Sequence, residues 1–198
     1  MRAAFKRDWL TNQVLIALLI SCLFCTTVSA VQLPSQSTDK NQLKSLFLYR
    51  LPKLIKWQNS SKAGAVFFRY CILDAPKFSS ALSALVSGKK IARKIIEVVA
   101  FDEKNSRQNC HIVFVGTASS INTQPSSQAL IKNLINKGVL LVGNHPSFIA
   151  AGGQINLANH YNKLIFEINK SVLQNTKLRI NSRLLDFANI VTPEREGR

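Results

Sequence analysis

The sequence predicts a single α/β domain, with a mainly parallel sheet flanked by helices, a C-terminal antiparallel hairpin and a closing helix. Two observations support this prediction. Between residues 65 and 142, apolar runs of strand length alternate with amphipathic runs of helix length, as in parallel sheets joined by helical crossovers. Residues 154–169 then hold two strand-length segments around a polar turn, which is typical of an antiparallel hairpin. No internal repeat or long linker interrupts this pattern.

The first 30 residues have the composition of a signal peptide. Three basic residues among the first seven precede an apolar run over 14–24, and Val28-Ser29-Ala30 matches a small-residue cleavage site. We therefore expect cleavage after Ala30, which leaves 31–198 as the mature domain. Two alternatives stay open. The residues before Cys22 resemble a lipobox, which would give a lipoprotein, and an uncleaved leader would anchor the chain, although its apolar run is short for a membrane span.

The exported chain would be strongly basic. The sequence has 26 Lys and Arg against 10 Asp and Glu, and the leader holds three of the former and one of the latter, which leaves a mature charge of +14. In a cytoplasmic protein this charge would indicate nucleic acid, but an exported chain meets little of it. The densest group, Lys89-Lys90 with Arg93-Lys94, has no interleaved aromatic residues. A solvated basic surface is the simplest interpretation, and attraction to anionic lipid head groups or to an acidic protein is the functional one.

The cysteines fit an oxidising compartment. Removal of the leader leaves Cys71 and Cys110, and an even pair in an exported chain predicts one disulfide. Two buried thiols are the alternative. The mature chain has no CxxC motif, so a thioredoxin-like redox role is not expected.

The domain is expected to begin with a helix that a proline interrupts. From Asp39 to Trp57, apolar residues recur at helical spacing, namely Leu43, Leu46, Phe47, Leu51, Leu54 and Ile55. Pro52 lies inside this pattern and cannot donate a hydrogen bond to the carbonyl of Leu48. The helix should therefore kink or break at this point.

Four strands and two helices are expected in the middle of the chain. The strand candidates are 65–73, 95–101, 110–116 and 139–142. Asp74 can cap the first of the two helices, and Gly88 ends it. Ser126 or Ser127 opens the second, and Gly138 closes it.

The C-terminal part is expected to form the hairpin and then the closing helix. Gln154 to Ala158 is one strand candidate, and in the other, LIFEIN over 164–169, apolar and polar residues alternate. Asn181 or Ser182 can cap a helix whose apolar stripe is Leu184, Leu185, Ala188 and Val191, and which Pro193 ends.

Three motifs in this part carry a family resemblance. They are F-x(3)-GG-x-I-N from residue 148, F-E-I-N from residue 166 and S-R-L-L-x-x-A-x-I-V from residue 182. In this order they resemble the YfiR family of small periplasmic proteins, and SLFLYRLPKLIKW from residue 45 resembles the first helix of that family. The resemblance implies a disulfide between the strands of Cys71 and Cys110. Some relatives have a second cysteine pair near the glycines, which this chain lacks, so regulation through such a pair is not carried over.

The resemblance also implies a function. Members are non-enzymatic regulators that bind the periplasmic domain of an inner-membrane diguanylate cyclase and repress it, which lowers cyclic-di-GMP signalling and biofilm formation. An outer-membrane lipoprotein that binds peptidoglycan sequesters the regulator, and relatives form homodimers. The same partners and a homodimer are expected for this chain, with no cofactor.

A partner-binding surface can be proposed from the residues near these motifs. Glu167 and Asn169 share one face of their strand, and Arg183 on the following helix could reach Glu167. The structural interpretation is an ion pair, with two glycines in a turn that needs positive φ or close backbone approach. The functional interpretation is a contact surface with an exposed apolar anchor. Its members would be Phe148, Gly152, Gly153, Glu167, Asn169 and Arg183.

Catalytic and metal-binding chemistry is not expected. The mature chain has nine carboxylates, and its three histidines, His111, His145 and His160, do not have metal-ligand spacing. The two consecutive glycines lack the context of a nucleotide-binding loop. A second hypothesis, from a different functional class, is a module that binds a small molecule at the ends of the parallel strands and acts as a sensor component.

Overall fold

A computed structural model describes residues 36–57, 66–102, 104, 109–116, 125–160 and 163–192. The predicted leader and cleavage site, together with Pro193, lie outside the described residues. Ser35–Arg198 form one compact unit. Within it, the elements are α2 (Gln36–Arg50), η1 (Leu51–Leu54), β1 (Ile55–Trp57), β2 (Phe67–Leu73), α3 (Pro76–Val86), β3 (Lys90–Ile91), β4 (Lys94–Ala100), β5 (Ile112–Val115), α4 (Pro125–Asn136), β6 (Leu140–Gly143), β7 (Ile155–His160), β8 (Lys163–Asn169), α5 (Lys170–Gln174), β9 (Leu178–Ile180), α6 (Ser182–Leu185) and β10 (Ala188–Val191).

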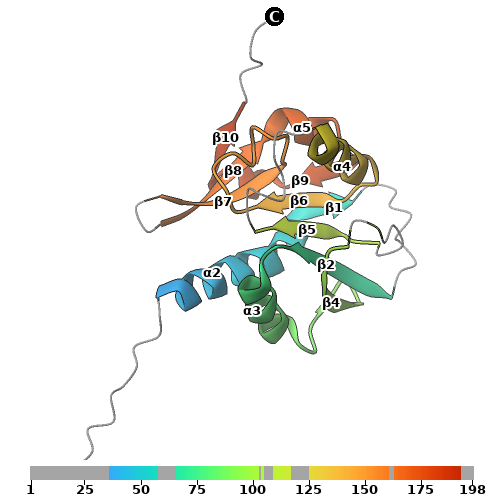
Figure 1. Cartoon of the computed structure of the whole chain (residues 1–198), viewed down its shortest axis with the longest axis vertical. Coiled ribbons are helices and arrows are strands. Elements are labelled where there is room, and N and C mark those ends of the chain that lie inside the picture. The colour runs from blue at the N-terminus through green and yellow to red at the C-terminus, as the bar shows by residue number, and fades with distance from the viewer. Residues whose placement is uncertain are drawn as a thin grey trace, which may run out of the picture. The chain divides into compact units, whose positions relative to one another are not determined.

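The central sheet has eight strands in the order β10-β8-β7-β6-β5-β2-β4-β3, and a second sheet pairs β1 with β9. Strands β4, β2, β5, β6 and β7 run parallel, whereas β3–β4 and β7–β8 are antiparallel pairs. Figure 1 shows the strands stacked from β10 at the top to β4 at the bottom. The predicted fold class, a mainly parallel α/β sheet with an antiparallel C-terminal hairpin, is confirmed.

The two faces of the sheet bury separate apolar clusters. Because side chains alternate along a strand, Tyr70 and Cys71 of β2 point to opposite faces. Tyr70 belongs to the cluster that includes buried residues of α2 and α3, and Cys71 belongs to the cluster that includes Ile131 of α4. Helices therefore cover both faces, as parallel sheets require.

The first helix ends where the sequence predicts. Helix α2 stops at Arg50, and Pro52 occupies the first turn of the short 3-10 helix η1, where a missing N–H is tolerated. The chain after η1 differs from the prediction. Ile55, expected in the helix, begins strand β1 and pairs with Ile180 of β9.

The start of α3 also differs from the prediction. The N-cap position is held by Ala75, one residue later than the predicted Asp74. Asp74 instead adopts a φ of 51° in the turn before it. The backbone there is crowded, since a Cβ on Gly116 would lie 2.6 Å from the carbonyl oxygen of Asp74. The predicted helix ends are confirmed, with φ of 69° at Gly88 and 68° at Gly138.

The closing helix is shorter than expected. The predicted cap is confirmed, because Asn181 Oδ1 accepts a hydrogen bond from the Arg183 amide at 3.0 Å. The helix ends after one turn, and Ala188 and Val191 lie in β10, which pairs in parallel with β8. These residues form a strand here because β10 pairs with backbone groups of β8 that would otherwise be unpaired at the edge of the sheet.

Candidate functional site

A disulfide and a polar cluster join three neighbouring strands at one end of the sheet. Cys71 of β2 is bonded to Cys110, which lies just before β5, with the two Cα atoms 5.8 Å apart and both residues buried. This is the disulfide that the cysteine count and the family resemblance predict. It closes a loop with a sequence separation of 39 residues.

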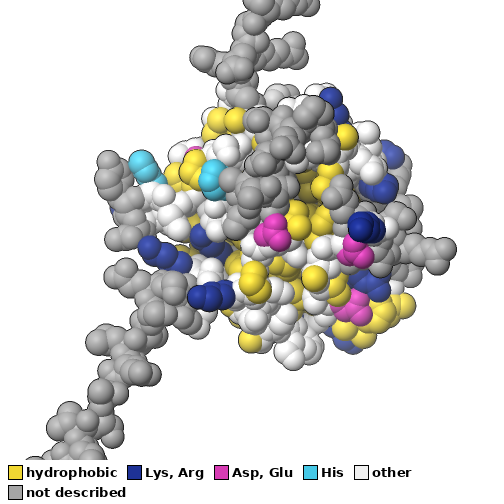
Figure 2. Space-filling view, in the orientation of Figure 1, with side chains coloured by type: hydrophobic (Ala, Val, Ile, Leu, Met, Phe, Trp, Pro, Cys, Tyr) yellow, Lys and Arg dark blue, Asp and Glu magenta, His cyan; other side chains and the backbone are white. Residues whose placement is uncertain are grey.

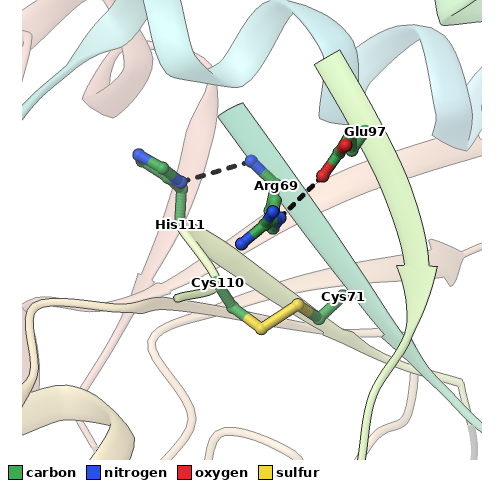
Figure 3. Close-up of polar contacts among 5 residues, drawn as sticks. All are labelled: Arg69, Cys71, Glu97, Cys110 and His111. Atoms are coloured by element: carbon green, nitrogen blue, oxygen red, sulfur yellow. Dashed lines mark hydrogen bonds and ion pairs between the residues drawn. A yellow bond between two sulfur atoms is a disulfide. The ribbon is translucent and has the colours of Figure 1, made fainter. Parts of the chain in front are cut away.

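The polar cluster beside the disulfide was not predicted from the sequence (Figure 3). Arg69 of β2 lies opposite Glu97 of β4 in the sheet register, and the Arg69 Nε and Glu97 Oε2 atoms are 2.6 Å apart. His111 accepts a hydrogen bond from the Arg69 amide at Nδ1, so its own proton lies on Nε2. Two charged residues 28 positions apart give no local signal, which is why the pair was missed. The ion pair and this hydrogen bond connect β4 and β2 with the residue before β5.

Next to β5 in the sheet, the glycine loop, defined as residues 144–153, packs over β6. The expectation that Phe148 is exposed is wrong, because only 3% of its surface is accessible. Its ring occupies a slot between two glycines. A Cβ on Gly143 or on Gly153 would lie 2.2 Å from the ring, so both positions must lack a side chain. Phe148 is therefore an internal anchor of the loop.

Both structural interpretations of the consecutive glycines are found. Gly152 has a φ of 94°, in the region that glycine favours. Gly153 allows the close approach of Phe148. Their requirement is thus explained by the packing of the loop.

Three buried amide side chains attach the glycine loop to the sheet. Gln154 Oε1 accepts from the Leu141 amide at 2.7 Å, and Asn156 Oδ1 accepts from the His145 amide at 3.0 Å. Asn169 Oδ1 accepts from the Val172 amide at 3.1 Å and caps α5, while its Nδ2 lies 3.5 Å from the carbonyl of Ile149. All three side chains are fully buried, so Asn169 does not lie on an exposed surface as expected. The Q-I-N and F-E-I-N motifs therefore encode internal hydrogen bonds.

Glu167 is half-buried on the same face as these amides. Its Oε2 accepts a hydrogen bond from Asn156 Nδ2 at 2.7 Å. In the sheet register it lies between Asn156 of β7 and Asn189 of β10, which makes a polar row across three strands. The expected ion pair with Arg183 is not among the ion pairs of the described residues, and Arg183 is exposed on α6. The Asn156 amide, not the arginine, orients this carboxylate.

A chain of polar contacts links the first helix to Glu167. Lys44 of α2 is buried, and its ammonium donates to Asn144 Oδ1 at the end of β6. The adjacent His145 amide is held by Asn156, which in turn holds Glu167. Burial lowers the pKa of Lys44, and the nearby charge of Lys40 lowers it further. Glu167 therefore depends on contacts that begin on the far face of the sheet.

One cavity lies beside the last elements of the fold. It has a volume of about 130 Å³ and is lined by apolar residues that include Ile168, Leu173 and Leu178, together with Lys170 and Arg179.

The strand order reverses at the carboxyl ends of β2 and β5, which is where parallel sheets commonly bind ligands. The backbone of Gly116 packs directly against Ala75 there, so this described part of the switch point is filled.

Within the described ranges, no three His, Cys, Asp or Glu side chains converge to hold a metal ion. No helix in the same ranges is long and apolar enough to cross a bilayer.

Comparison with known proteins identifies the family. No curated protein matches the chain. The family model described as YfiR/HmsC-like matches residues 41–189, which include every helix and strand from β1 to β9, most of α2 and the start of β10. The match contains the glycine loop, the polar row and both disulfide cysteines. This chain therefore belongs to the YfiR/HmsC-like family.

Proposed function

We propose that this protein is a periplasmic, non-enzymatic regulator that binds the periplasmic domain of an inner-membrane diguanylate cyclase and holds the cyclase inactive. Family membership supports a periplasmic regulator of a diguanylate cyclase. Binding of this kind would lower cyclic-di-GMP signalling and biofilm formation. Release would follow when an outer-membrane lipoprotein sequesters the regulator.

The proposal rests on the exposure and the hydrogen bond of the carboxylate of Glu167. Its carboxylate is partly exposed, lies on the face of the last three strands and is oriented by Asn156 at 2.7 Å. A charged group that is already fixed loses little entropy when a partner binds it. Asn189, which pairs with Glu167 in the sheet register, is exposed and extends the polar row. Arg183, six residues before Asn189, is also exposed. We assign partner contact to Glu167, Asn189 and Arg183.

The other predicted contact residues lie in or beside the glycine loop and position this surface through internal contacts. Phe148, Gly152 and Gly153 shape the glycine loop, and the loop backbone at His145 holds Asn156. Asn169 fixes the start of α5. In this proposal they determine where Glu167 lies, and they do not touch the partner.

Capture of the cyclase from solubilised inner membranes tests the proposal. Glu167→Gln keeps the size of the side chain and removes its charge, so we expect about tenfold weaker capture with unchanged melting temperature, since a charged hydrogen bond contributes about 1.5–3 kcal/mol. Glu97→Gln is the matched control, because Glu97 is also a strand carboxylate with 31% of its side chain exposed. Equal capture by the two variants, or recovery of no cyclase by the wild-type chain, would contradict the proposal.

The homodimer and the sequestering lipoprotein are further parts of the same proposal. Sedimentation equilibrium measures the first directly. Addition of the lipoprotein to the regulator–cyclase complex should restore cyclase activity. A complex that keeps the cyclase inactive with the lipoprotein in excess would remove that step.

A small-molecule sensor is the second candidate, and the cavity beside α5 and β9 favours it. Its volume of about 130 Å³ is below the usual range for drug-sized ligands, so it would suit a small apolar fragment with an anionic group near Lys170 or Arg179. A ligand that raises the melting temperature of the isolated protein would support this function. Saturation by the cyclase alone would support the regulator.

A further inference from the structure

Two segments that include β3, the last strand at the end of the sheet away from Glu167, are rich in basic residues. The segments 40–57 and 76–96 contain ten Lys and Arg and no Asp or Glu. They form η1, β1, α3 and β3 and most of α2, with the start of β4. Two of these basic residues lie elsewhere, because Lys44 contacts Asn144 and Lys56 lies on β1, which pairs with β9. On the face shown in Figure 2, Lys and Arg side chains gather over α2. The positive charge of this region has no carboxylate within its own segments to balance it.

Two ammonium groups of this region contact one aromatic ring. Lys53 Nζ lies 5.8 Å and Lys89 Nζ lies 5.1 Å from the centroid of the Tyr49 ring. Both distances are within the range of a cation–π contact. Lys89 is followed by Lys90 of β3, and Arg93 lies in the turn between β3 and β4. We name the surface made by Tyr49, Arg50, Lys53, Lys89, Lys90 and Arg93 the basic edge. Its five cationic side chains are all exposed.

Exposed aliphatic side chains lie next to the basic edge. Ile95 is 43% and Val66 is 63% exposed. Lys90 and Ile95 are register partners in the β3–β4 pair, and the Ile95 amide donates to the Val66 carbonyl at 3.0 Å. Lysines and exposed apolar residues therefore share one sheet edge. This mixture is typical of surfaces that rest in the interface of a bilayer.

We propose that the basic edge binds the anionic phospholipid surface of a membrane. The exposed side chains of Ile95 and Val66 beside these cations favour a bilayer over an acidic protein, because the membrane interface accepts apolar side chains together with positive charge. Each Lys or Arg near an anionic surface adds to the attraction, so five of them suffice for reversible binding without a preformed pocket.

The position of the basic edge fits the proposed function, on which the biological meaning of the inference rests. Strand β3 is the last strand at one end of the sheet, and β10 and β8 are the first two at the other end. Eight strands at their usual spacing separate the two ends by roughly 34 Å. Membrane contact through the basic edge thus leaves Glu167 available to a protein partner.

Vesicle sedimentation tests the inference without any cyclase. The full chain is expressed, recovered after export and mixed with vesicles of phosphatidylcholine containing 30% phosphatidylglycerol, or with phosphatidylcholine alone. We expect binding to the anionic vesicles that is lost in high salt, and no binding to the neutral ones. The variant with Lys53, Lys89, Lys90 and Arg93 all changed to Gln should bind about a hundredfold more weakly or worse.

A matched variant separates a defined surface from net charge. Lys132, Lys137, Lys163 and Lys170 are also exposed, and their joint change to Gln lowers the net charge by the same amount. This control should sediment as wild type, and both variants should stay folded, with a melting temperature a few degrees lower in the basic-edge variant because it loses the two contacts with Tyr49. Equal losses in the two variants would overturn the inference. Wild-type sedimentation of the basic-edge variant, with loss of capture of an acidic protein from membranes, would also overturn it in favour of a protein ligand. Neither outcome bears on Glu167, so the proposed function is tested separately.

Discussion

The two halves of the eight-stranded sheet are fastened by different chemistry. Strands β4, β2 and β5 are joined by the Cys71–Cys110 bond and the Arg69–Glu97 ion pair. Strands β6, β7 and β8 are joined by neutral amides, of which Gln154 and Asn156 are fully buried. In the first half the bond is covalent and buried. In the second half Gln154, Asn156 and Asn169 each accept a hydrogen bond from a backbone amide, and the proposed partner surface lies in that half.

The glycine loop is held by noncovalent contacts alone in its own residues. It contains no cysteine. The Phe148 ring lies between Gly143 and Gly153, and Asn156 Oδ1 accepts a hydrogen bond from the His145 amide.

Removal of the disulfide should have the largest effect on stability. Cys71→Ser should lower the free energy of unfolding by about 4 kcal/mol, because the bond closes a long loop in the unfolded chain. Urea denaturation in oxidising buffer measures this, with the reduced wild-type protein as the control. Coincident curves for wild type and variant without reductant would show that the bond does not stabilise the fold.

A charge placed inside the amide network should have the next largest effect. Asn156→Asp would bring a second carboxylate against Glu167, and we expect a loss of about 3 kcal/mol at pH 7. Stability should recover as the pH falls, because protonation restores a donor toward Glu167. Asn159→Asp is the matched control, since Asn159 is exposed on the same strand. Equal stability of the two variants would mean that the Asn156 contact is dispensable.

The slot for Phe148 can be tested by filling it. Gly153→Ala would place a methyl group 2.2 Å from the ring, and we expect a cost of about 2 kcal/mol from overpacking. Thermal unfolding measures the cost. In the background of Phe148→Ala the same substitution should cost much less, as a double-mutant cycle would show. Strict additivity of the two changes would show that the Phe148 ring is not what excludes a side chain at residue 153.

The smallest predicted effect concerns alkaline pH. Burial raises the pKa of Tyr70, with a smaller contribution from Tyr49, so the folded protein keeps a proton that the unfolded chain releases near pH 10. Its contribution is therefore complete below about pH 10 and declines above it. The lowered pKa of Lys44 acts in the opposite direction, up to the unfolded value near 10.4.

Tyr70→Phe should flatten the decline above pH 10. It should also cost about 1 kcal/mol at pH 7, because the Tyr70 hydroxyl donates to the Leu48 carbonyl at 3.2 Å. Chemical denaturation at pH 7 and pH 11 measures both effects. An equally steep decline in the variant would assign the alkaline sensitivity to other groups.

The elements with strong local patterns were predictable, and those defined by distant partners were not. Alternation in LIFEIN predicted β8, and Pro52 predicted the end of the first helix. Strands β1 and β10 have three and four residues and continue an apolar helical stripe, so no local signal separates them from the preceding turns. Only their pairing partners determine their structure.

The candidate site was predictable in location but not in detail. The motifs indicated the glycine loop and the strand of Glu167. They did not indicate that Phe148 is buried, because its slot is made by the absence of side chains at Gly143 and Gly153. They also did not indicate that Asn156 orients Glu167, since this depends on the register between two strands.

The pairing of β1 with β9 has a consequence for synthesis. Ile55 pairs with Ile180 in the register of this sheet. Strand β1 therefore cannot form its pairing until residues about 125 positions later have been made. A chain that emerges amino end first can close its disulfide long before this ribbon forms. The two-stranded sheet of β1 and β9 would then be among the last parts of the fold to form.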